Sequence, residues 1–364
     1  MVNYDTLTDL NILYDAFQKS RKGVDWKCSI QKYEANLLPE LMKLRKALIS
    51  GTYRQKPFFE FNITERGKHR HIKSLHISDR VLQRALCDYV LIPTFYRYLI
   101  YDNGASVKGK GIEFTRNRIV AHLQKFYRKH GNRGYILLLD YSKFFDSIPH
   151  DILMGMIREK ISDERLVRLL GELIKTFDEG DGRSLGIGSQ VSQIFGIYYP
   201  TRIDTYVKVV KGCKYYGRYM DDLYVIHHDK RFLQELLKDI VKLSEGMGLT
   251  VNLRKTQICR IDRGFRFLKL YHFVTPTGKV IRKPCKKGIT RERRKIRKLY
   301  KQGVLLDDVL ESYKSWRGNM LKYNSYRSVR SMDHLFNEIY GEQLYAERKS
   351  IITKRSKSNH RRTL

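Results

Sequence analysis

The sequence predicts an α+β fold, because helical and strand-like patterns follow one another without regular alternation. Two observations support this prediction. Between residues 37 and 48 apolar side chains recur mainly at three- and four-residue spacings, which is typical of an amphipathic helix. Residues 135–139 form a nearly continuous apolar run before Asp140, which is typical of a buried strand. With 364 residues the chain is long enough for two or three hydrophobic cores.

The remaining elements are expected in order along the chain. Residues 5–50 have helical patterns that close at Gly51, and residues 58–63 alternate like a strand before a hairpin tip at 66–68. Strongly basic helices are expected after residue 276. Further helices are expected at 79–100, with a break near Pro93, and at 232–246, and further strands are expected at 198–204, on both sides of 219–222, and at 249–253.

Positive charge dominates the composition. Lys and Arg number 71 against 38 Asp and Glu, which leaves a formal net charge of +33. Because the cations cluster instead of alternating with acids, nucleic acid is the expected partner, and solubility alone is the alternative.

The chain is expected to be soluble and cytoplasmic, with no membrane partner. No segment approaches the roughly 18 consecutive apolar residues that span a bilayer, and the N-terminus lacks a signal-peptide pattern. The five cysteines are widely spaced, which favours free thiols in a reducing compartment over disulfides or a zinc ribbon.

Three aspartates stand where structure alone disfavours a carboxylate. Asp140 ends the apolar strand, and Asp221 and Asp222 stand at the crest of an apolar hairpin. Burial and like-charge repulsion oppose both positions. Aspartates that converge from two strands can hold two divalent cations for phosphoryl transfer, and all-oxygen ligands favour Mg²⁺, with Mn²⁺ as a substitute. A solvated turn and a helix cap are the structural alternatives.

The segments around these aspartates resemble those of reverse transcriptases. Residues 215–222, Tyr-Tyr-Gly-Arg-Tyr-Met-Asp-Asp, resemble the catalytic hairpin, and residues 139–148 resemble the first catalytic segment. The resemblance implies a right-hand polymerase fold with fingers, a palm with an antiparallel sheet and a helical thumb. It also implies an RNA-directed DNA polymerase that binds template RNA, cDNA and deoxynucleoside triphosphates. Further matching segments stand in the family's order at 79–83, 253–256 and 267–268, so that the resemblance covers about residues 25–340.

The resemblance also divides the chain into three parts. N-terminal helices and fingers are expected at 1–135, the palm at 136–275 with inserted helices at 151–180, and a basic thumb with a tail at 276–364. Residues 279–301 contain twelve Lys or Arg and one acid, Glu292. The helix expected here therefore lacks the acidic residues that would pair with its cations on a solvent-exposed face. Cations mixed with the aromatic residues at 313–326 are typical of a nucleic-acid surface, although Tyr313 and Trp316 are also candidates for the core.

The resemblance assigns catalytic roles residue by residue. Asp140 and Asp221 are the main metal ligands, and Asp222 stands beside them. Lys255 matches a cation that assists the departure of pyrophosphate, with a plain surface charge as the alternative.

Substrate contacts follow from the same resemblance. Lys68 and Arg70 match fingertip cations that grip the incoming triphosphate, and a solvated basic hairpin is the alternative for Lys68. Phe145 matches a ring that blocks a ribose 2′-hydroxyl and so selects deoxynucleotides, with a core aromatic as the alternative. The segment that faces the nascent base pair contributes Ile187, Gly188 and Gln193.

That last segment departs from most of the family. Ile187 stands where a glutamine is usual, and Gln193 stands where a proline is usual. This pattern, like residues 102–111, resembles the reverse transcriptases of diversity-generating retroelements. Losing an amide near the nucleotide loosens selection, because polar contacts discriminate more sharply than apolar ones. The resemblance thus implies error-prone copying of a template repeat and a small basic helical accessory protein as partner.

Other functions stay open at this point. A defence-associated, retron or intron-type reverse transcriptase fits the same motifs. A catalytically silent RNA-binding scaffold fits the charge, although it has no use for repelling aspartates. An RNA-copying RNA polymerase shares the metal site, but Phe145 argues against it.

Overall fold

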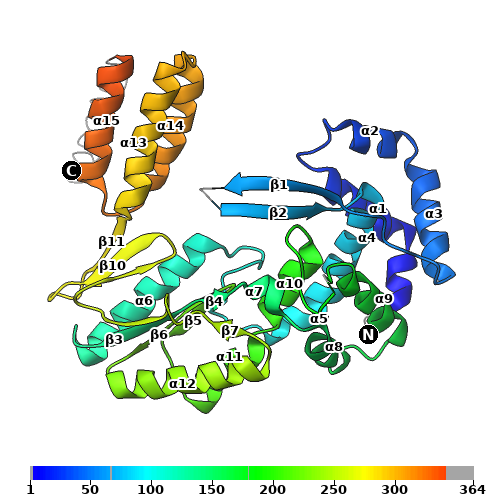
Figure 1. Ribbon diagram of the computed structural model, residues 1–364, viewed down its shortest axis with the longest axis horizontal. Coiled ribbons are helices and arrows are strands. Elements are labelled where there is room, and N and C mark those ends of the chain that lie inside the picture. The colour runs from blue at the N-terminus through cyan, green and yellow to red at the C-terminus, as the bar shows by residue number, and fades with distance from the viewer. Residues whose placement is uncertain (1–2, 66–67, 179, 342–364) are drawn as a thin grey trace, which may run out of the picture. The chain divides into compact units, whose positions relative to one another are not determined.

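The structure, a computed structural model, describes residues 3–65, 68–178 and 180–341 (Figure 1). By its internal contacts the chain divides into two compact units. The first contains the residues up to His122 together with Tyr135–Ile258, and the second contains Leu123–Gly134 and the chain from Cys259 onward. Helices and strands follow in no regular alternation, so the α+β prediction is confirmed. The three-part division at residues 135 and 275 stays a prediction.

Helices form the N-terminal part, as the sequence predicts. A 3₁₀ turn at Tyr4–Thr8 precedes α1 (Leu10–Arg21), α2 (Cys28–Ala35) and α3 (Leu37–Ile49). The buried side of α3 consists of leucines three and four residues apart. The helix closes at Gly51, whose φ of +68° is a left-handed conformation that glycine adopts without strain.

An antiparallel hairpin follows, made of β1 (Phe59–Glu65) and β2 (Lys68–Ser74). Its tip at 66–67 lies outside the described residues. The next helical stretch consists of α4 (Ile77–Leu86), a π-helical turn (Cys87–Leu91), α5 (Ile92–Phe95) and a 3₁₀ turn (Tyr96–Tyr98). Pro93 stands in the first turn of α5, where its missing backbone N–H costs little.

The rest of the first unit places helices around a central sheet. No helix in the described ranges is both long and apolar enough to cross a membrane. The helices are α6 (Ile112–His130, which continues into the second unit), α7 (Phe144–Ser147), α8 (His150–Arg158), α9 (Glu164–Lys175), α10 (Gln190–Tyr198), α11 (Thr201–Thr205), a π-helical turn (Tyr206–Val210) and α12 (Lys230–Gly246).

The sheet carries the predicted apolar strands. Its order is β5-β6-β3-β8, and β6 is antiparallel to both β5 and β3. β3 is buried along nearly its whole length, which explains its continuous apolar run. α12 packs on β3 and β6. The strands are β3 (Tyr135–Leu139), β5 (Tyr216–Tyr219), β6 (Asp222–His227) and β8 (Gln257–Arg260), and a separate pair joins β4 (Tyr141–Ser142) to β7 (Thr250–Val251).

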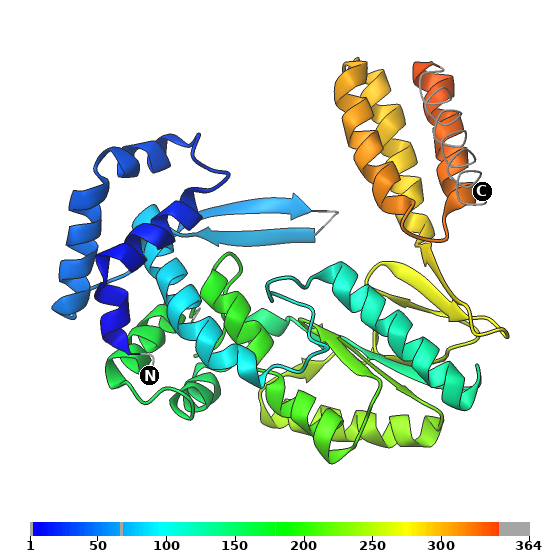
Figure 2. The same ribbon diagram turned by 180° about the vertical axis from the view of Figure 1, so that it is seen from behind.

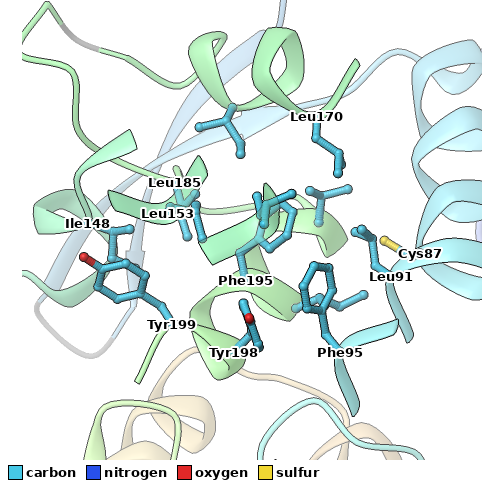
Figure 3. Packing of buried hydrophobic residues seen from close by; sticks show 14 of the residues in the cluster. Cys87, Leu91, Phe95, Ile148, Leu153, Leu170, Leu185, Phe195, Tyr198 and Tyr199 are labelled. Atoms are coloured by element: carbon cyan, nitrogen blue, oxygen red, sulfur yellow. The ribbon is translucent and has the colours of Figure 1, made fainter. Parts of the chain in front are cut away.

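Residues 198–204 were expected as a strand, and this prediction is wrong, because the segment belongs to α10 and α11. Ser189 begins α10, since its hydroxyl oxygen accepts a hydrogen bond from the Ser192 N–H. Figure 3 shows Phe195 of this helix in the apolar core beside Phe95, with ring centroids 5.8 Å apart. Pro200 within the segment cannot donate a backbone hydrogen bond to a neighbouring strand, and it stands directly before α11.

The second unit combines a small sheet with three helices. The antiparallel strands β9 (Phe265–Phe267), β10 (Leu270–Val274) and β11 (Val280–Pro284) lead to α13 (Lys286–Lys301), α14 (Leu306–Met320) and α15 (Tyr326–Tyr340). The three helices run side by side in both views (Figures 1 and 2). Tyr313 is buried and Trp316 packs beside it, so both belong to the core of this unit. The basic tail after residue 341 lies outside the described residues.

Candidate active site

Two of the three aspartates stand at the turn between β5 and β6. Tyr219 pairs with Asp222, so Met220 and Asp221 form a two-residue turn. Met220 has a φ of +57°, a sign that two-residue hairpins need to match the strand twist. This conformation costs a residue with a side chain about 1–2 kcal/mol. The surrounding structure must therefore hold the turn in place.

Asp140 reaches the same end of the sheet from the neighbouring strand. Leu139 pairs with Leu223, and Asp140 directly follows Leu139. Burial raises the pKa of the Asp221 carboxyl, and the charge of Asp140 raises it further. The ends of β3 and β6 thus bring two carboxylates into electrostatic contact.

Lys255 stands among these carboxylates. Its Nζ forms an ion pair and hydrogen bond with Oδ2 of Asp140. That bond raises the pKa of Lys255, and the charges of Asp140, Asp221 and Asp222 raise it further. Asp140 therefore contacts this ammonium group directly, and Asp221 and Asp222 lie close enough for their charges to act on it.

The donor chemistry of this cluster fits divalent cations. All the donors are carboxylate oxygens, which Mg²⁺ and Mn²⁺ prefer, and a nearby cation would stabilise the disfavoured charge of Asp221. Among the described residues, no group of three or more Asp, Glu, His or Cys side chains is arranged as a ready-made metal site. A metal ion bound to Asp140 would compete with the Lys255 ammonium for the same carboxylate.

Phe145 lies beside the aspartate turn. It belongs to α7 and is half-buried. A Cβ added at Gly196 of α10 would come within 2.8 Å of the Phe145 ring and 3.5 Å of the Met220 sulfur. The ring therefore packs where Gly196 leaves space, next to the turn, while part of its surface stays accessible.

Comparison with known proteins identifies the family of this chain. Residues 55–272 match the sequence model described as reverse transcriptase (RNA-dependent DNA polymerase). The chain belongs to the reverse transcriptase family. The right-hand polymerase fold and the class of RNA-directed DNA polymerase follow from this membership.

Individual relatives of this reverse transcriptase are distant. Protein YkfC of Escherichia coli is 26% identical over 281 residues, which cover 65% of this chain and 71% of that protein. A putative COX1/OXI3 intron 2 protein of Saccharomyces cerevisiae is 23% identical over 358 residues, which cover 78% of this chain but only 40% of the yeast protein. A solved telomerase from Candida albicans, in complex with a TWJ fragment of telomeric RNA, gives a TM-score of 0.49 at 13% identity, over 79% of this chain and 60% of that one.

The segment that departs from most reverse transcriptases lies against the base of the β1–β2 hairpin. Gly188 has a φ of +127°, and a Cβ there would come within 2.7 Å of the Lys73 carbonyl oxygen. Ile187 beside it is 40% exposed. Gln193 stands in α10, where its side-chain oxygen accepts a hydrogen bond of 3.4 Å from the Ser106 hydroxyl. The loop at 102–111 is thus linked directly to this segment.

The fingertip cations stand on the same hairpin. The backbone places Lys68 at the start of β2, opposite Glu65, and Arg70 opposite Ile63. The structure describes the backbone of Lys68 and Arg70 but not their side chains. Their contacts with a triphosphate therefore remain a prediction.

A buried ion pair between the β5–β6 hairpin and α11 was not identified from the sequence. Arg218 and Asp204 are 0% and 1% exposed, and Nη2 of Arg218 lies 2.7 Å from Oδ2 of Asp204. Arg218 also donates hydrogen bonds of 3.0 Å to the Met220 carbonyl and 2.8 Å to the Ile197 carbonyl. The guanidinium therefore ties the strained turn to α10 and α11. The available signal in the sequence was a basic residue, Arg218, within the predicted strand before the aspartate turn.

The backbone of Arg218 anchors the loop at 102–111 as well. Its N–H donates to the Asp102 carbonyl, and its carbonyl accepts from the Gly104 N–H, both at 3.1 Å. Asp102 is buried and accepts hydrogen bonds from Arg118 and Lys208. The loop at 102–111 is therefore fixed to the strand that leads into the aspartate turn.

Proposed function

We propose that this chain copies an RNA template into cDNA at the site formed by Asp140, Asp221 and Asp222. The observation that supports this most is that Asp140 at the end of β3, paired with Lys255, lies at the same end of the sheet as the β5–β6 turn that carries Asp221 and Asp222. Two Mg²⁺ ions, or Mn²⁺ in their place, would be held by these aspartates and would stabilise the charge that develops during phosphoryl transfer.

Neighbouring side chains would position the reactants. Lys255, which pairs with Asp140, would offer positive charge to the departing pyrophosphate once a metal binds Asp140. The accessible part of the Phe145 ring would lie under the sugar and exclude a 2′-hydroxyl. Lys68 and Arg70 would grip the triphosphate, while Ile187, Gly188 and Gln193 would face the nascent base pair.

Primer extension tests this proposal. Purified chain is supplied with an RNA template, a DNA primer, Mg²⁺ and deoxynucleotides, and Asp221→Ala is the matched inactive variant. Extension by the wild type alone is the expected result. If neither protein extends the primer while both bind the RNA, the chain is a silent RNA-binding scaffold instead.

We further propose that copying is error-prone, as in diversity-generating retroelements, and that a small basic helical accessory protein takes part. Ile187 and Gln193 carry this proposal, because an apolar side chain replaces an amide beside the nucleotide. Sequencing of the cDNA is the test, and errors concentrated at template adenines are expected. Uniformly low error would favour an intron-type enzyme, an assignment that the similarity to the yeast intron 2 protein supports, or a retron or defence-associated enzyme.

A further inference from the structure

Three polar side chains form a chain of hydrogen bonds beside the segment at 187–193, and Gln83 of α4 stands in the middle of this chain. Nε2 of Gln83 donates a hydrogen bond of 3.0 Å to Oε1 of Gln55, in the loop before the β1–β2 hairpin. Oε1 of Gln83 accepts one of 2.7 Å from the hydroxyl of Ser189. Gln83 is 2% exposed and Ser189 is 1% exposed, so their contact is shielded from water.

The position of Gln83 in α4 favours an apolar side chain. Its neighbours Val81 and Leu82 are buried and apolar, and a leucine or methionine would fill the same space without polar atoms. Burying an amide without partners costs stability, whereas a buried amide that is fully hydrogen-bonded fixes one arrangement of the groups around it. Because both ends of the Gln83 amide are bound, this residue determines where Gln55 and Ser189 stand relative to α4.

Ser189 carries this position into the neighbouring segment. Its hydroxyl proton goes to Gln83, while its hydroxyl oxygen accepts a hydrogen bond of 3.4 Å from the Ser192 N–H at the start of α10. Gly188 directly precedes Ser189, and Ile187 precedes Gly188. A shift of Ser189 would therefore move the backbone that presents the partly exposed side chain of Ile187.

A second contact between α4 and α10 lies closer to solvent. Nη1 of Arg84 lies 3.4 Å from Oε1 of Gln190, and Nε of Arg84 is bound to Asp88 at 3.0 Å. The side chain of Arg84 is one third exposed, so water competes for its contacts. The buried hydrogen bond between Gln83 and Ser189 is therefore the firmer link of the two.

We propose that Gln83 is a positioning residue for nucleotide selection, which holds Ser189 and thereby fixes where Ile187 and Gly188 meet the nascent base pair. The proposal rests on the proposed function, in which these two residues face that base pair. Gln83 is too deeply buried to touch a nucleotide itself, so it acts through Ser189. Side chains that lock a site in this way affect selection, because a displacement of about 1 Å is enough to disturb a reacting geometry.

Four single variants of the full chain test this role. Gln83→Met keeps the approximate size of the side chain but removes both hydrogen bonds, and Ser189→Ala removes the same contact from the side of α10. Gln83→Glu keeps an oxygen that accepts from the Ser189 hydroxyl in either protonation state. Ser78→Ala is the control, because it removes a buried hydroxyl of the same helix that bonds to His76 at 2.8 Å and not to α10.

Selection is measured by single-nucleotide addition on an RNA template, as the ratio of kcat/KM for the matched deoxynucleotide to kcat/KM for a mismatched one. The fraction of folded enzyme cancels in this ratio, so a general loss of stability leaves it unchanged. Gln83→Met and Ser189→Ala are each expected to lower the ratio about fivefold or more, whereas Gln83→Glu and Ser78→Ala should stay within about twofold of the wild type. In the double variant Gln83→Met/Ser189→Ala the two effects should not multiply, because both substitutions break one hydrogen bond.

Unchanged ratios in Gln83→Met and Ser189→Ala would overturn the proposal, and so would a double variant in which the two losses multiply in full. If the wild type adds no nucleotide, the proposed function itself fails. If the wild type is active but selects equally well without Gln83, the positioning role alone fails.

Hydrogen exchange of the backbone amides at 185–193 gives a readout that needs neither metal nor activity. This exchange should be faster in Gln83→Met than in the wild type, in Gln83→Glu and in Ser78→Ala, because the segment loses its buried attachment to α4. Exchange in Gln83→Met that equals exchange in the wild type would overturn the role of Gln83, whatever the outcome of the addition assay.

Discussion

The buried pair of Arg218 and Asp204 gives the sharpest prediction about stability. Arg218→Leu leaves the Asp204 carboxylate without its cation inside the core, and removes the donors that hold the carbonyls of Met220 and Ile197. Removing one partner of a buried ion pair costs about 3–5 kcal/mol of unfolding free energy. Because both side chains are almost completely buried, solvent screening does not reduce this figure.

The double variant Arg218→Leu/Asp204→Leu separates the charge effect from the hydrogen bonds. It leaves no unpaired charge, so its loss of unfolding free energy should fall short of the sum of the single losses by about 2–3 kcal/mol. It still leaves the Met220 carbonyl without its donor, and each missing partner costs about 1–3 kcal/mol. The double variant should therefore fold but hold the aspartate turn less firmly, and half-maximal primer extension should need more Mg²⁺.

Urea denaturation at neutral pH measures these differences, and Arg202→Leu is the matched control. Arg202 pairs with Glu159 at 2.6 Å, but both side chains are about half exposed, at 52% and 50%. Such a surface pair contributes about 0–1 kcal/mol. Two results would contradict this reasoning. One is a loss of unfolding free energy in Arg218→Leu no larger than that in Arg202→Leu, and the other is a loss in the double variant equal to the full sum of the two single losses. In either case the ion pair does not hold the hairpin as described.

Three further predictions concern single positions. Asp221→Asn should raise the unfolding free energy of the metal-free chain at neutral pH while abolishing extension, because the raised pKa of Asp221 shows that folding disfavours its charge. Urea denaturation should show this gain disappear as the pH falls below the ordinary range of aspartate, where both states keep the proton. Gly188→Ala should lower the thermal unfolding midpoint by an amount equivalent to about 1–3 kcal/mol, because of its φ and the contact with the Lys73 carbonyl. Phe145→Ala should increase the incorporation of ribonucleotides relative to deoxynucleotides in single-addition assays.

Each of these predictions has an outcome that contradicts it. A metal-free Asp221→Asn variant no more stable than the wild type would mean that the carboxylate is not disfavoured by its surroundings. Gly155→Ala in α8 is the control for Gly188, since a Cβ there meets nothing within 4 Å and alanine should add about 0.5–1 kcal/mol. Equal effects of the two glycine substitutions would refute the steric argument. Unchanged nucleotide selection in Phe145→Ala would mean that the ring serves only as a core aromatic.

Local patterns in the sequence predicted most elements around the site. The apolar run of β3 and the helix α12 follow directly from hydrophobic periodicity, and the hairpin of β5 and β6 follows from two apolar runs around Asp221 and Asp222. The prediction of a strand at 198–204 was wrong. The segment contains Pro200, which lacks the backbone N–H that a strand inside a sheet needs, and α11 begins directly after it.

The sequence by itself determined the family, the three aspartates that stand against local preference and the excess of positive charge, because each is written in residue type and spacing along the chain. Only the tertiary structure decided that Lys255 lies on Asp140, 115 positions away, that Arg218 reaches Asp204 beneath the strained Met220 turn, and that α4 holds the start of α10 through a buried hydrogen bond. Such contacts join elements through space. Their energies depend on burial and on atomic distances, which residue order does not specify.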